Sequence, residues 1–537
     1  MANRIVAELI VERLAARGVR YMFGVPGGDC NLDIIEAGNR VGVEFVLTRG
    51  ETAAAIIASV VAELTGTPGV VMTTRGPGLA NGVNGVAYAS LDRAPLLVIA
   101  DNYEDGLDHV SHQRIDQAGL LRPLLKAESS LAQDDVGTEI DALLDAATAQ
   151  PPGPVYLEIT GQRIRSAIPV PATAPARSAP APAASVNAGD LSDAENLLAR
   201  SKRPLVIAGL QARQTEAAAS LRRFVSRHDC PVLLTYKAKG VVSDTDPHAL
   251  GPYIDGAAER SAVEASDLII LYGFDPIEGP PTKWRHDKPL IELTEHRFDR
   301  PLVQANVSIV GPIAASLDRI GAAKPSATRD ATELADAKRA IRARAMTGSN
   351  GGISPNYVVA CASEALPANC RITVDAGAHM LPVLHLWESQ EPNATLISRG
   401  LATMGFALPA AIASALVEPE RPVVAFTGDG GLLMCLGELA TAVQRKCKLV
   451  VIVFNDSCLT LIEAKQRRRQ MANAGVNLSP VNFASLAEGF GCAGFRVERP
   501  EDLRGAIAAA LAADGPAVVD AVVDPHPYYE QIISLRG

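Results

Sequence analysis

The chain has 537 residues, of which 48% are apolar and 20% are charged, and its formal net charge is −10. This length allows about three domains with sizeable cores, and the composition is that of a globular protein rather than a disordered one. The negative charge balance argues against nonspecific binding to nucleic acid. We therefore expect no nucleic-acid partner.

The eight cysteines lie far apart along the chain and form no CxxC pair, so the sequence indicates neither a zinc site nor a disulfide framework. Such cysteine usage is typical of a reduced cytoplasm. The first residues, MANRIVAELIVERLAARG, are typical of an amphipathic helix and unlike a signal peptide, and no apolar run reaches about 18 residues. We therefore expect a cytoplasmic protein without a membrane span.

Predicted strands and helices alternate along residues 1–166, which we interpret as one domain. The helical spacing that begins at residue 4 stops at Gly18. The expected strands are 21–25, 43–47, 69–73 and 95–100. The repetition of strand, glycine turn and helix predicts a doubly wound α/β domain whose ligand edge lies at the carboxyl ends of its strands.

Two passages of low hydrophobicity divide the rest of the chain. The first, 167–188, is dominated by Pro, Ala and Ser and is expected to be an extended linker. The second, 324–352, separates a middle domain at 189–323 from a C-terminal domain at 353–537. The strands expected in these two domains are 204–209, 232–235, 268–272, 290–293, 372–374, 423–427, 449–454 and 517–523. The predicted fold class is therefore α/β, with three doubly wound parallel-sheet domains.

The segment 423–457 carries the clearest chemical pattern. An apolar run ends in Gly428, Asp429, Gly430 and Gly431, and a helix expected to begin near Leu432 leads to a second apolar run that ends in Asn455, Asp456 and Ser457. Strands joined through a crossover helix run parallel, so their carboxyl ends reach the same edge of the sheet. Asp429 and Asn455 are therefore expected to lie close together.

This expected edge suits a phosphate and a hard metal ion. Glycines let a backbone approach a ligand closely, and a helix N-terminus favours negative charge. Mg²⁺ shares its octahedral shell between carboxylate, carbonyl and phosphate oxygens, which Asp429 and Asn455 would help to supply. An ordinary parallel sheet with two polar strand ends is the structural alternative. The chain has neither a GxxxxGK[ST] loop nor a GxGxxG fingerprint.

The GDG sequence, followed after this interval by Asn at a strand end, resembles the diphosphate and metal signature of thiamine diphosphate enzymes. The resemblance implies that Asp429 and Asn455 bind Mg²⁺ through their side chains and Ser457 through its carbonyl. It also implies that thiamine diphosphate contacts the glycine turn and Leu459, which follows the metal site.

The three-domain organisation is similar to that of the acetolactate synthase, 2-oxo acid decarboxylase and benzoylformate decarboxylase group. In that group the first domain binds the pyrimidine, the third binds the diphosphate, and the two share one fold, although this sequence shows no internal repeat. The cofactor lies between two subunits. The resemblance therefore implies a homodimer or homotetramer with active sites at the subunit interface.

Glu51 stands where an expected strand gives way to a helix. A carboxylate in the first helical turn complements the helix dipole by about 0.3–1 kcal/mol, which is the structural interpretation. The resemblance implies a catalytic one, because these enzymes use a glutamate here to hydrogen-bond the aminopyrimidine and promote loss of the thiazolium C2 proton. The cofactor then acts as the electron sink. Many relatives carry His before this glutamate, where this chain has Gly50.

Three glycine-rich loops resemble other cofactor contacts of the group. Thr74 and Gly76 belong to a segment similar to TSGPG, with Arg75 in place of Ser, although a simple turn is the alternative. Gly28 matches a further active-site loop. Residues 400–406 resemble GLGTMGF, which implies that Ala402 supplies a carbonyl and that Met404 supplies an amide and a wedge for the bent cofactor. The alternative for Met404 is a flexible core filler.

His112 and Gln113 lie in a polar stretch, DHVSHQRIDQ, that is similar to the FQEVD-type segment of the group. A histidine in such a stretch is commonly a surface residue, although its ordinary pKa suits proton transfer near neutrality. We hypothesise that His112 or Gln113 handles protons or the substrate carboxylate.

The resemblance implies thiamine diphosphate- and Mg²⁺-dependent decarboxylation of a 2-oxo acid, with release of an aldehyde or its transfer to a second carbonyl. Acetolactate synthase itself is one alternative, and a catalytically inactive, cofactor-binding regulatory subunit is another. Acetohydroxyacid synthases carry Trp near Ala464 and a DDR-like, FAD-associated sequence where this chain has Phe274-Asp275-Pro276-Ile277-Glu278. Both departures argue against the biosynthetic enzyme and against FAD.

Overall fold

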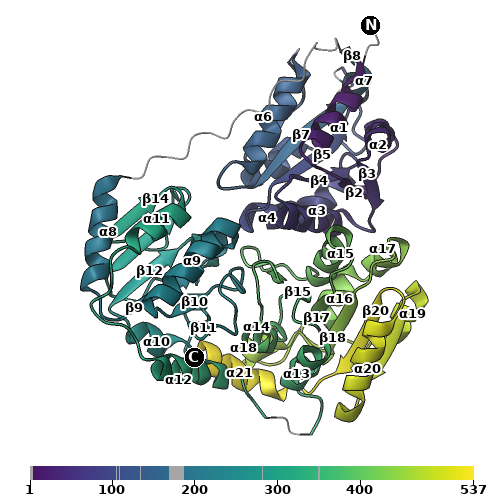
Figure 1. Ribbon diagram of the computed structural model, residues 1–537. Helices are drawn as coiled ribbons and strands as arrows, with labels where there is room; N and C mark the ends of the chain where they lie inside the picture. The colour runs from purple at the N-terminus through teal and green to yellow at the C-terminus, as the bar shows by residue number, and fades with distance from the viewer. Residues whose placement is uncertain are drawn as a thin grey trace. The chain divides into compact units, whose positions relative to one another are not determined.

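The computed structural model describes residues 4–104, 106–107, 109–133, 135–168, 187–280, 282–348 and 351–537. The described parts of Met1–Pro180, Leu408–Glu420 and Met434–Cys447 form a first compact unit, and those of Ala181–Ala407, Arg421–Leu433 and Lys448–Gly537 form a second. Three six-stranded sheets, each fully parallel, confirm the predicted α/β class (Figure 1).

The first sheet lies in the first unit and has the strand order β3-β2-β4-β5-β7-β6. Its strands are β2 (Tyr21–Val25), β3 (Glu44–Leu47), β4 (Gly69–Thr73), β5 (Leu96–Asn102), β6 (Ala127–Ser129) and β7 (Pro154–Thr160). Its helices are α1 (Val6–Ala16), α2 (Cys30–Val41), α3 (Glu51–Thr65), α4 (Pro77–Leu91), α5 (Gln117–Leu121), α6 (Val136–Thr148) and α7 (Gly161–Arg165). The first four expected strands are present, and β6 and β7 were not predicted.

The middle sheet lies in the second unit and has the order β11-β10-β9-β12-β13-β14. Numbered within the sheet, this is 3-2-1-4-5-6, the order of dinucleotide-binding folds, with its switch point between β9 and β12. The strands are β9 (Pro204–Ala208), β10 (Val232–Leu234), β11 (Ala249–Pro252), β12 (Leu268–Tyr272), β13 (Leu290–Thr294) and β14 (Val307–Val310). The helices are α8 (Ala188–Arg200), α9 (Thr215–His228), α10 (Arg260–Glu264) and α11 (Ile313–Ile320), with short 3₁₀ turns η2 (Leu210–Arg213) and η3 (Pro276–Glu278).

The third sheet, also in the second unit, has the order β16-β15-β17-β18-β20-β19. Its strands are β15 (Arg371–Val374), β16 (Thr395–Ile397), β17 (Val423–Gly428), β18 (Val450–Asn455), β19 (Ala493–Val497) and β20 (Ala517–Val522). Numbered within each sheet, the first and third sheets both read 2-1-3-4-6-5. The two therefore share one topology, as the resemblance implied, although no sequence repeat shows it.

The helices between these strands differ in detail from the prediction. The helix after β17 begins at Asp429, three residues before the expected Leu432, and it is two short helices, α16 (Asp429–Cys435) and α17 (Glu438–Gln444). The other helices of this region are α13 (Pro355–Ala365), α14 (Met380–Leu386), α15 (Ala407–Val417), α18 (Thr460–Arg468), α19 (Phe483–Phe490), α20 (Pro500–Ala512) and α21 (His526–Arg536).

The two passages expected to be linkers contain ordered elements at the described positions. Ala167–Ile168 forms β8, which pairs antiparallel with β1 (Arg4–Ile5), while 169–186 lie outside the described residues. The second passage contains helix α12 (Ala331–Ala343), whose Leu334 and Ile341 are buried. They join a single apolar core that also contains residues of the middle and third sheets. One continuous core therefore joins the middle and third sheets, and a second cluster packs elsewhere against the middle sheet.

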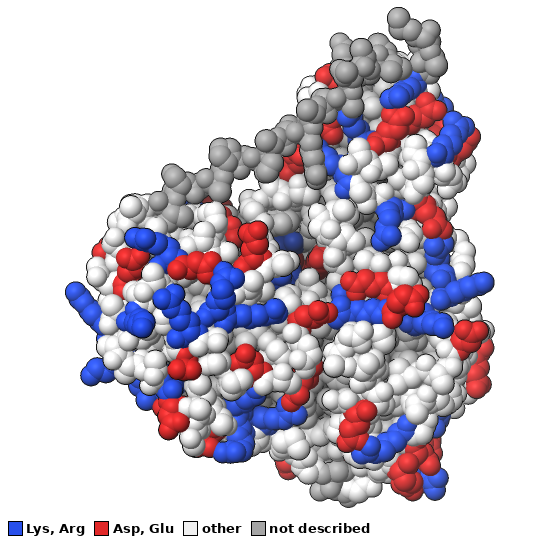
Figure 2. Space-filling model, viewed as in Figure 1, with Lys and Arg blue, Asp and Glu red and all other residues white. Residues whose placement is uncertain are grey.

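Acidic and basic side chains are interspersed over the face seen in Figure 2. This mixture differs from the one-sided basic patch of nucleic-acid-binding proteins. Among the described residues, no helix is both long enough and apolar enough to cross a bilayer. All eight cysteines are free thiols.

Candidate functional site

The turn after β17 holds a buried carboxylate without a full set of partners. Gly428 pairs with Phe454 in the parallel register, so Asp429 and Asn455 follow at neighbouring strand ends. Asp429 is 5% exposed; its Oδ1 accepts a hydrogen bond from the Gly430 amide at 2.6 Å, and its Oδ2 has no partner. Burial raises the pKa of Asp429, although nearby backbone amides oppose that rise. A bound cation would compensate this carboxylate.

The other two predicted metal ligands lie beside it on the β18 turn. Asn455 donates its side-chain amide to Asp520 Oδ1 at 2.8 Å and to the Val481 carbonyl at 2.9 Å, which fixes its Oδ1 as the group left to accept. Ser457 has a left-handed φ of 56°, and its carbonyl accepts the Leu478 amide at 2.8 Å, which leaves a second lone pair.

This donor set fits Mg²⁺. Within the described part of the chain, no group of three or more His, Cys, Asp and Glu side chains converges as a metal cage. One carboxylate, one amide oxygen and one carbonyl leave room in an octahedral shell for phosphate and water oxygens, which is the sharing that Mg²⁺ prefers.

A cavity of about 730 Å³ opens beside this turn within the second unit. The predicted cofactor residues in its lining are Ala402, Met404, Gly428, Asp429, Gly430, Gly431 and Leu459. A Cβ placed on Gly430 would lie 2.7 Å from a Leu459 methyl and 3.6 Å from the Met404 methyl. The structure therefore brings the glycine turn, the loop after β16 and the start of the α18 segment to one cavity.

His379, which the sequence analysis missed, also lines this cavity. It is 4% exposed, its ring stacks on Phe454 at 5.5 Å between centroids, and its Nε2 has no partner. Burial lowers the pKa of His379 to about 3, so the ring is neutral at physiological pH. The only sequence signal was a histidine shortly after a predicted strand end, which is weak.

Asp375, a second residue that was missed, ties the Met404 loop to β17. This fully buried carboxylate accepts hydrogen bonds from the Gly405 amide at 3.1 Å, the Phe406 amide at 3.3 Å and the Thr427 hydroxyl at 3.0 Å. Burial raises its pKa to about 6. Asp375 therefore positions the loop that carries Ala402 and Met404.

Replacing Gly431 by Ala is expected to destabilise the second unit. The added Cβ would lie 2.4 Å from Asp375 Oδ2 and 3.0 Å from Thr427 Oγ1, so the buried carboxylate must move. We expect a loss of about 1–3 kcal/mol in the free energy of unfolding, measured by denaturant titration. Gly505→Ala in α20 is the matched control, because nothing lies within 4 Å of its added Cβ; it is expected to stabilise slightly. Equal effects of the two changes would contradict this account.

Replacing Ala402 by Gly is expected to stabilise the protein. Ala402 has a left-handed φ of 53°, which is strained for a residue with a Cβ. Removing the Cβ is expected to raise the free energy of unfolding by about 1 kcal/mol. Ala508→Gly in the helix α20 is expected to lower it by a similar amount, since glycine weakens an ordinary helix. Thermal or denaturant melts of both variants check the opposite signs.

A second group of predicted residues meets in the first unit, around Glu51. Glu51 is 8% exposed, and its Oε2 accepts a hydrogen bond from the Asn81 side-chain amide at 2.5 Å. A Cβ on Gly78 would lie 3.2 Å from Glu51 Oε1, so the glycine of the predicted loop leaves space for the carboxylate. Asn81 was missed because a lone Asn in a helical stretch carries little signal. Glu51 thus has an orienting partner at the N-terminus of α3.

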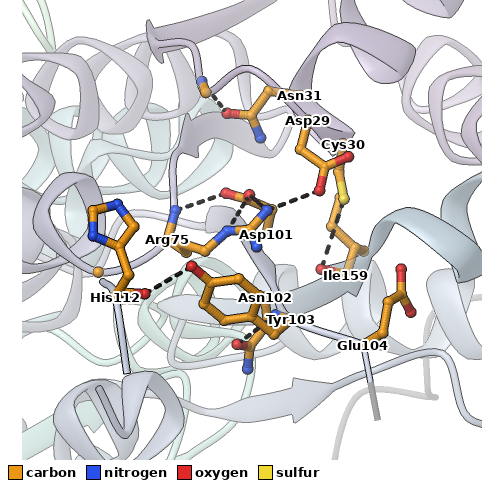
Figure 3. A network of polar contacts seen from close by, with 12 residues as sticks. Asp29, Cys30, Asn31, Arg75, Asp101, Asn102, Tyr103, Glu104, His112 and Ile159 are labelled. Carbon is orange, nitrogen blue, oxygen red and sulfur yellow. Dashed lines mark hydrogen bonds and ion pairs between the residues drawn. The ribbon is translucent and has the colours of Figure 1, made fainter. Parts of the chain in front are cut away.

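Arg75, which replaces the serine of the resembled loop, is the centre of a polar network (Figure 3). Its guanidinium contacts Asp101 at 2.5 Å and Asp29 at 2.8 Å, and it lies over the Tyr103 ring at 4.3 Å. Burial tends to raise the pKa of Asp29, but bonds from Arg165 and Arg75 lower it overall. The Tyr103 hydroxyl donates to the His112 carbonyl at 2.7 Å. Arg75 therefore anchors the loop that carries His112.

His112 and Gln113 are themselves exposed in the single chain. Figure 3 shows the His112 ring turned away from the Arg75 network, with only its backbone oxygen engaged. Gln113 has a left-handed φ of 55°, and a Cβ on Gly76 would lie 2.4 Å from its carbonyl. Thr74 Oγ1 would lie 2.6 Å from a Cβ on Gly27, whereas a Cβ on Gly28 would meet nothing within 4 Å. The structure thus places Gly76 against Gln113 and Thr74 against the Gly27 loop.

A buried carboxylate fills the ligand edge of the middle sheet. Glu278 Oε2 accepts the Leu210 amide at 2.7 Å, and its Oε1 accepts the Thr235 hydroxyl at 2.6 Å. Leu210 belongs to the turn after β9, which is the pyrophosphate-binding turn in sheets of this order. A Cβ on Gly209 would lie 2.6 Å from Glu278 Oε2. The protein's own carboxylate therefore takes the place that a dinucleotide phosphate would need.

The stability of the second unit is expected to depend on pH through Glu278. Burial raises the pKa of Glu278 from 4.5 to about 7, so the folded chain holds this proton where the unfolded chain releases it. Protonation of Glu278 contributes roughly 3 kcal/mol to the free energy of unfolding. This contribution is complete below pH 4.5 and is lost as the pH rises to about 7. Denaturant melts across this window should show a steeper fall of stability with pH in the wild type than in Glu278→Gln, where only other buried carboxyls such as Asp375 contribute. Parallel profiles would contradict this assignment.

Comparison with known proteins supports the relation that the motifs suggest. Residues 4–120, 191–320 and 375–521 match the N-terminal TPP binding, central and C-terminal TPP binding domains of the thiamine pyrophosphate enzymes. Thiamine pyrophosphate is another name for thiamine diphosphate. The chain is 30% identical to the acetolactate synthase of Bacillus subtilis over 536 residues, which cover 96% of this chain and 93% of the relative.

Two further relatives have similar coverage. Over 534 residues the chain is 28% identical to the catabolic acetolactate synthase of Raoultella terrigena, covering 96% of this chain and 95% of the relative. Over 553 residues it is 28% identical to the acetolactate synthase large subunit of Haemophilus influenzae, covering 98% of this chain and 96% of the relative. Together with the shared topology of the first and third sheets, these matches confirm the resemblance. The chain belongs to the thiamine pyrophosphate enzyme family.

Proposed function

We propose that the protein is a thiamine diphosphate- and Mg²⁺-dependent enzyme that decarboxylates a 2-oxo acid and releases an aldehyde or joins the remaining fragment to a second carbonyl. The observation that carries the proposal is the buried, unpartnered Asp429 Oδ2 beside Asn455, at a cavity also lined by His379, whose buried Nε2 has no partner either. Unsatisfied buried polar atoms are rare, so several at one cavity indicate a missing ligand.

The second unit would hold the diphosphate and the metal. Asp429, the Asn455 Oδ1 and the Ser457 carbonyl would bind Mg²⁺, while the glycine turn at the start of α16 would offer space and backbone amides to phosphate oxygens. Neutral His379 lines the same cavity, and its Nε2 has no partner. Met404, whose loop Asp375 holds in place through the backbone, would form part of the cavity wall that contacts the cofactor.

Thiamine diphosphate, when bound, supplies a carbon nucleophile and an electron sink for decarboxylation. Glu51 would hold a hydrogen bond to the aminopyrimidine, and Asn81 keeps its carboxylate oriented at 2.5 Å. His112 and Gln113 would move protons or contact the substrate carboxylate. Family resemblance supports a homodimer or homotetramer in which Glu51 of one subunit serves the metal site of another, and eight free thiols favour a cytoplasmic setting.

We also propose that the middle domain does not use FAD. At the switch point, the Glu278 carboxyl accepts hydrogen bonds from the Leu210 amide and from the Thr235 hydroxyl. Displacing it would leave a buried carboxyl without its donors. Purified holoenzyme should show no flavin absorbance, and FAD added to it should leave turnover unchanged.

A screen of 2-oxo acids tests the proposed function. The protein is loaded with thiamine diphosphate and Mg²⁺, supplied with each acid with and without an acceptor aldehyde, and followed by carbon dioxide release and product analysis. Acetolactate from pyruvate would identify acetolactate synthase activity, and aldehyde alone would identify a decarboxylase. Failure to bind the cofactor would overturn the proposal. Binding with C2 proton exchange no faster than in free thiamine diphosphate would favour the regulatory alternative.

A further inference from the structure

The 730 Å³ cavity has a cationic region distinct from its metal turn. Besides the predicted cofactor residues, its lining includes Arg285, Arg399, Lys465 and Arg536. Three acids share this lining, namely Asp255, Asp429 and Asp456. Asp255 is paired with Arg285 at 2.9 Å, and the other two lie on the turns after β17 and β18. The basic side chains of the lining therefore lie on elements other than these two turns.

Tyr236 marks the centre of this cationic region. The Arg399 guanidinium lies 5.8 Å from the centre of its ring and donates to the Glu278 carbonyl at 2.8 Å. Burial raises the pKa of Tyr236 to about 12, and the charges of Arg536 and Arg399 oppose the rise. Tyr236 is 3% exposed, lines the cavity, and has a hydroxyl without a partner. The phenol beside the Arg399 guanidinium, in a cavity that Arg536 also lines, offers hydrogen-bond donors to an anion.

The spacing of the strands separates this region from the metal turn. Arg399 follows β16, whereas Asp429 follows β17, and β15 lies between these two strands in the sheet. Neighbouring strands lie about 4.8 Å apart, so the carboxyl ends of β16 and β17 are on the order of 10 Å apart. The cationic region therefore suits a ligand group other than the metal-bound diphosphate.

The chemistry of decarboxylation indicates which group that is. In the proposed reaction the bond between the carboxylate carbon and the carbonyl carbon breaks, carbon dioxide leaves without charge, and the electron pair stays on the carbonyl carbon. Cations beside the departing carboxylate would stabilise the ground state more than the transition state and slow the step. A cationic pocket is better matched to an anionic group that persists from substrate to product.

We propose that Arg399, Arg536 and Tyr236 bind a second anionic group of the substrate, so that the preferred substrates are 2-oxo acids with a terminal carboxylate or an equivalent anion. This inference rests on the proposed function. Lys465, exposed on α18 in the cavity lining, adds positive charge that attracts such substrates.

The experiment compares substrates matched in length, using holoenzyme saturated with thiamine diphosphate and Mg²⁺. The pairs are 2-oxoglutarate with 2-oxopentanoate, and 2-oxoadipate with 2-oxohexanoate. The expected result is a kcat/KM about tenfold or more higher for a dicarboxylic acid than for its partner. Arg536→Gln is expected to lower kcat/KM for the dicarboxylic acid by about tenfold or more, mainly through KM, and to change it by less than about threefold for the monocarboxylic acid.

Two variants separate substrate binding from folding. Tyr236→Phe removes only the hydroxyl, so it is expected to fold, to retain the cofactor and to reduce the dicarboxylate preference severalfold. Arg499→Gln, on the exposed start of α20, is the charge-matched control and should keep the preference. Equal turnover of the members of each pair, or equal effects of Arg536→Gln on both, would overturn this inference while leaving the proposed function intact. Turnover of no 2-oxo acid by cofactor-loaded enzyme would instead overturn the proposed function.

Discussion

Replacing Asp429 by Asn is expected to abolish Mg²⁺-dependent binding of thiamine diphosphate while leaving the cofactor-free fold as stable as the wild type or more so. The carboxylate is buried, one of its oxygens has no partner, and burial raises its pKa, so in the absence of metal it opposes folding. A ligand present at a hundred times its dissociation constant adds about 2.7 kcal/mol to the wild type. That increment should vanish in the variant.

Thermal melts with and without cofactor and Mg²⁺, together with titration calorimetry, measure both parts of this expectation. Asp514→Asn is the matched control, since this side chain is fully exposed and far along the chain from the metal turn. A variant that loses stability without ligand, or that still gains stability from cofactor and Mg²⁺ together, would show that Asp429 is a structural carboxylate.

Replacing Glu51 by Gln is expected to lower kcat by about 10²–10⁴-fold while cofactor binding is largely kept. Gln has the size of Glu and can still accept the hydrogen bond from Asn81, so the local geometry should persist. It lacks the negative charge that favours a protonated aminopyrimidine. Steady-state kinetics and cofactor titration of the same preparation separate the two effects.

Glu63→Gln provides the control for Glu51→Gln, because Glu63 lies on the same helix α3 and its carboxylate accepts the Tyr88 hydroxyl. This variant should keep wild-type turnover. An unchanged kcat in Glu51→Gln would leave only the helix-dipole interpretation of that residue.

The strands that were predicted are mainly continuous apolar runs. β4, β12 and β18 are buried on both faces, so their sequences are dominated by consecutive apolar residues. The strands that were missed lack this signal. β6 and β16 are three-residue edge strands, and the apolar run of β7 is interrupted by Glu158, whose carboxylate accepts the Tyr156 hydroxyl. Their pairing depends on neighbours that are distant in sequence.

The residues of the candidate site also divide into those that the sequence predicted and those that it missed. Asp429, Asn455 and Glu51 were predictable because strand ends and glycine turns locate them locally. Their supporting residues were not, because Asn81 meets Glu51 from 30 positions away and Asp375 meets Thr427 from 52 positions away. No short motif records such contacts. The assignments of individual residues to catalysis and metal binding remain predictions that the variants above test.

The continuous core beneath the middle and third sheets has a consequence for how ligands enter. Swinging the two sheets apart would expose buried apolar side chains of both sheets to water. That exposure costs about 25 cal/mol of free energy for each Å² of apolar surface. A hinge motion between the two sheets is therefore energetically unfavourable. We expect the cavity to keep its dimensions whether or not a ligand is bound. Selection among substrates then depends on the fixed shape and charge of the cavity walls.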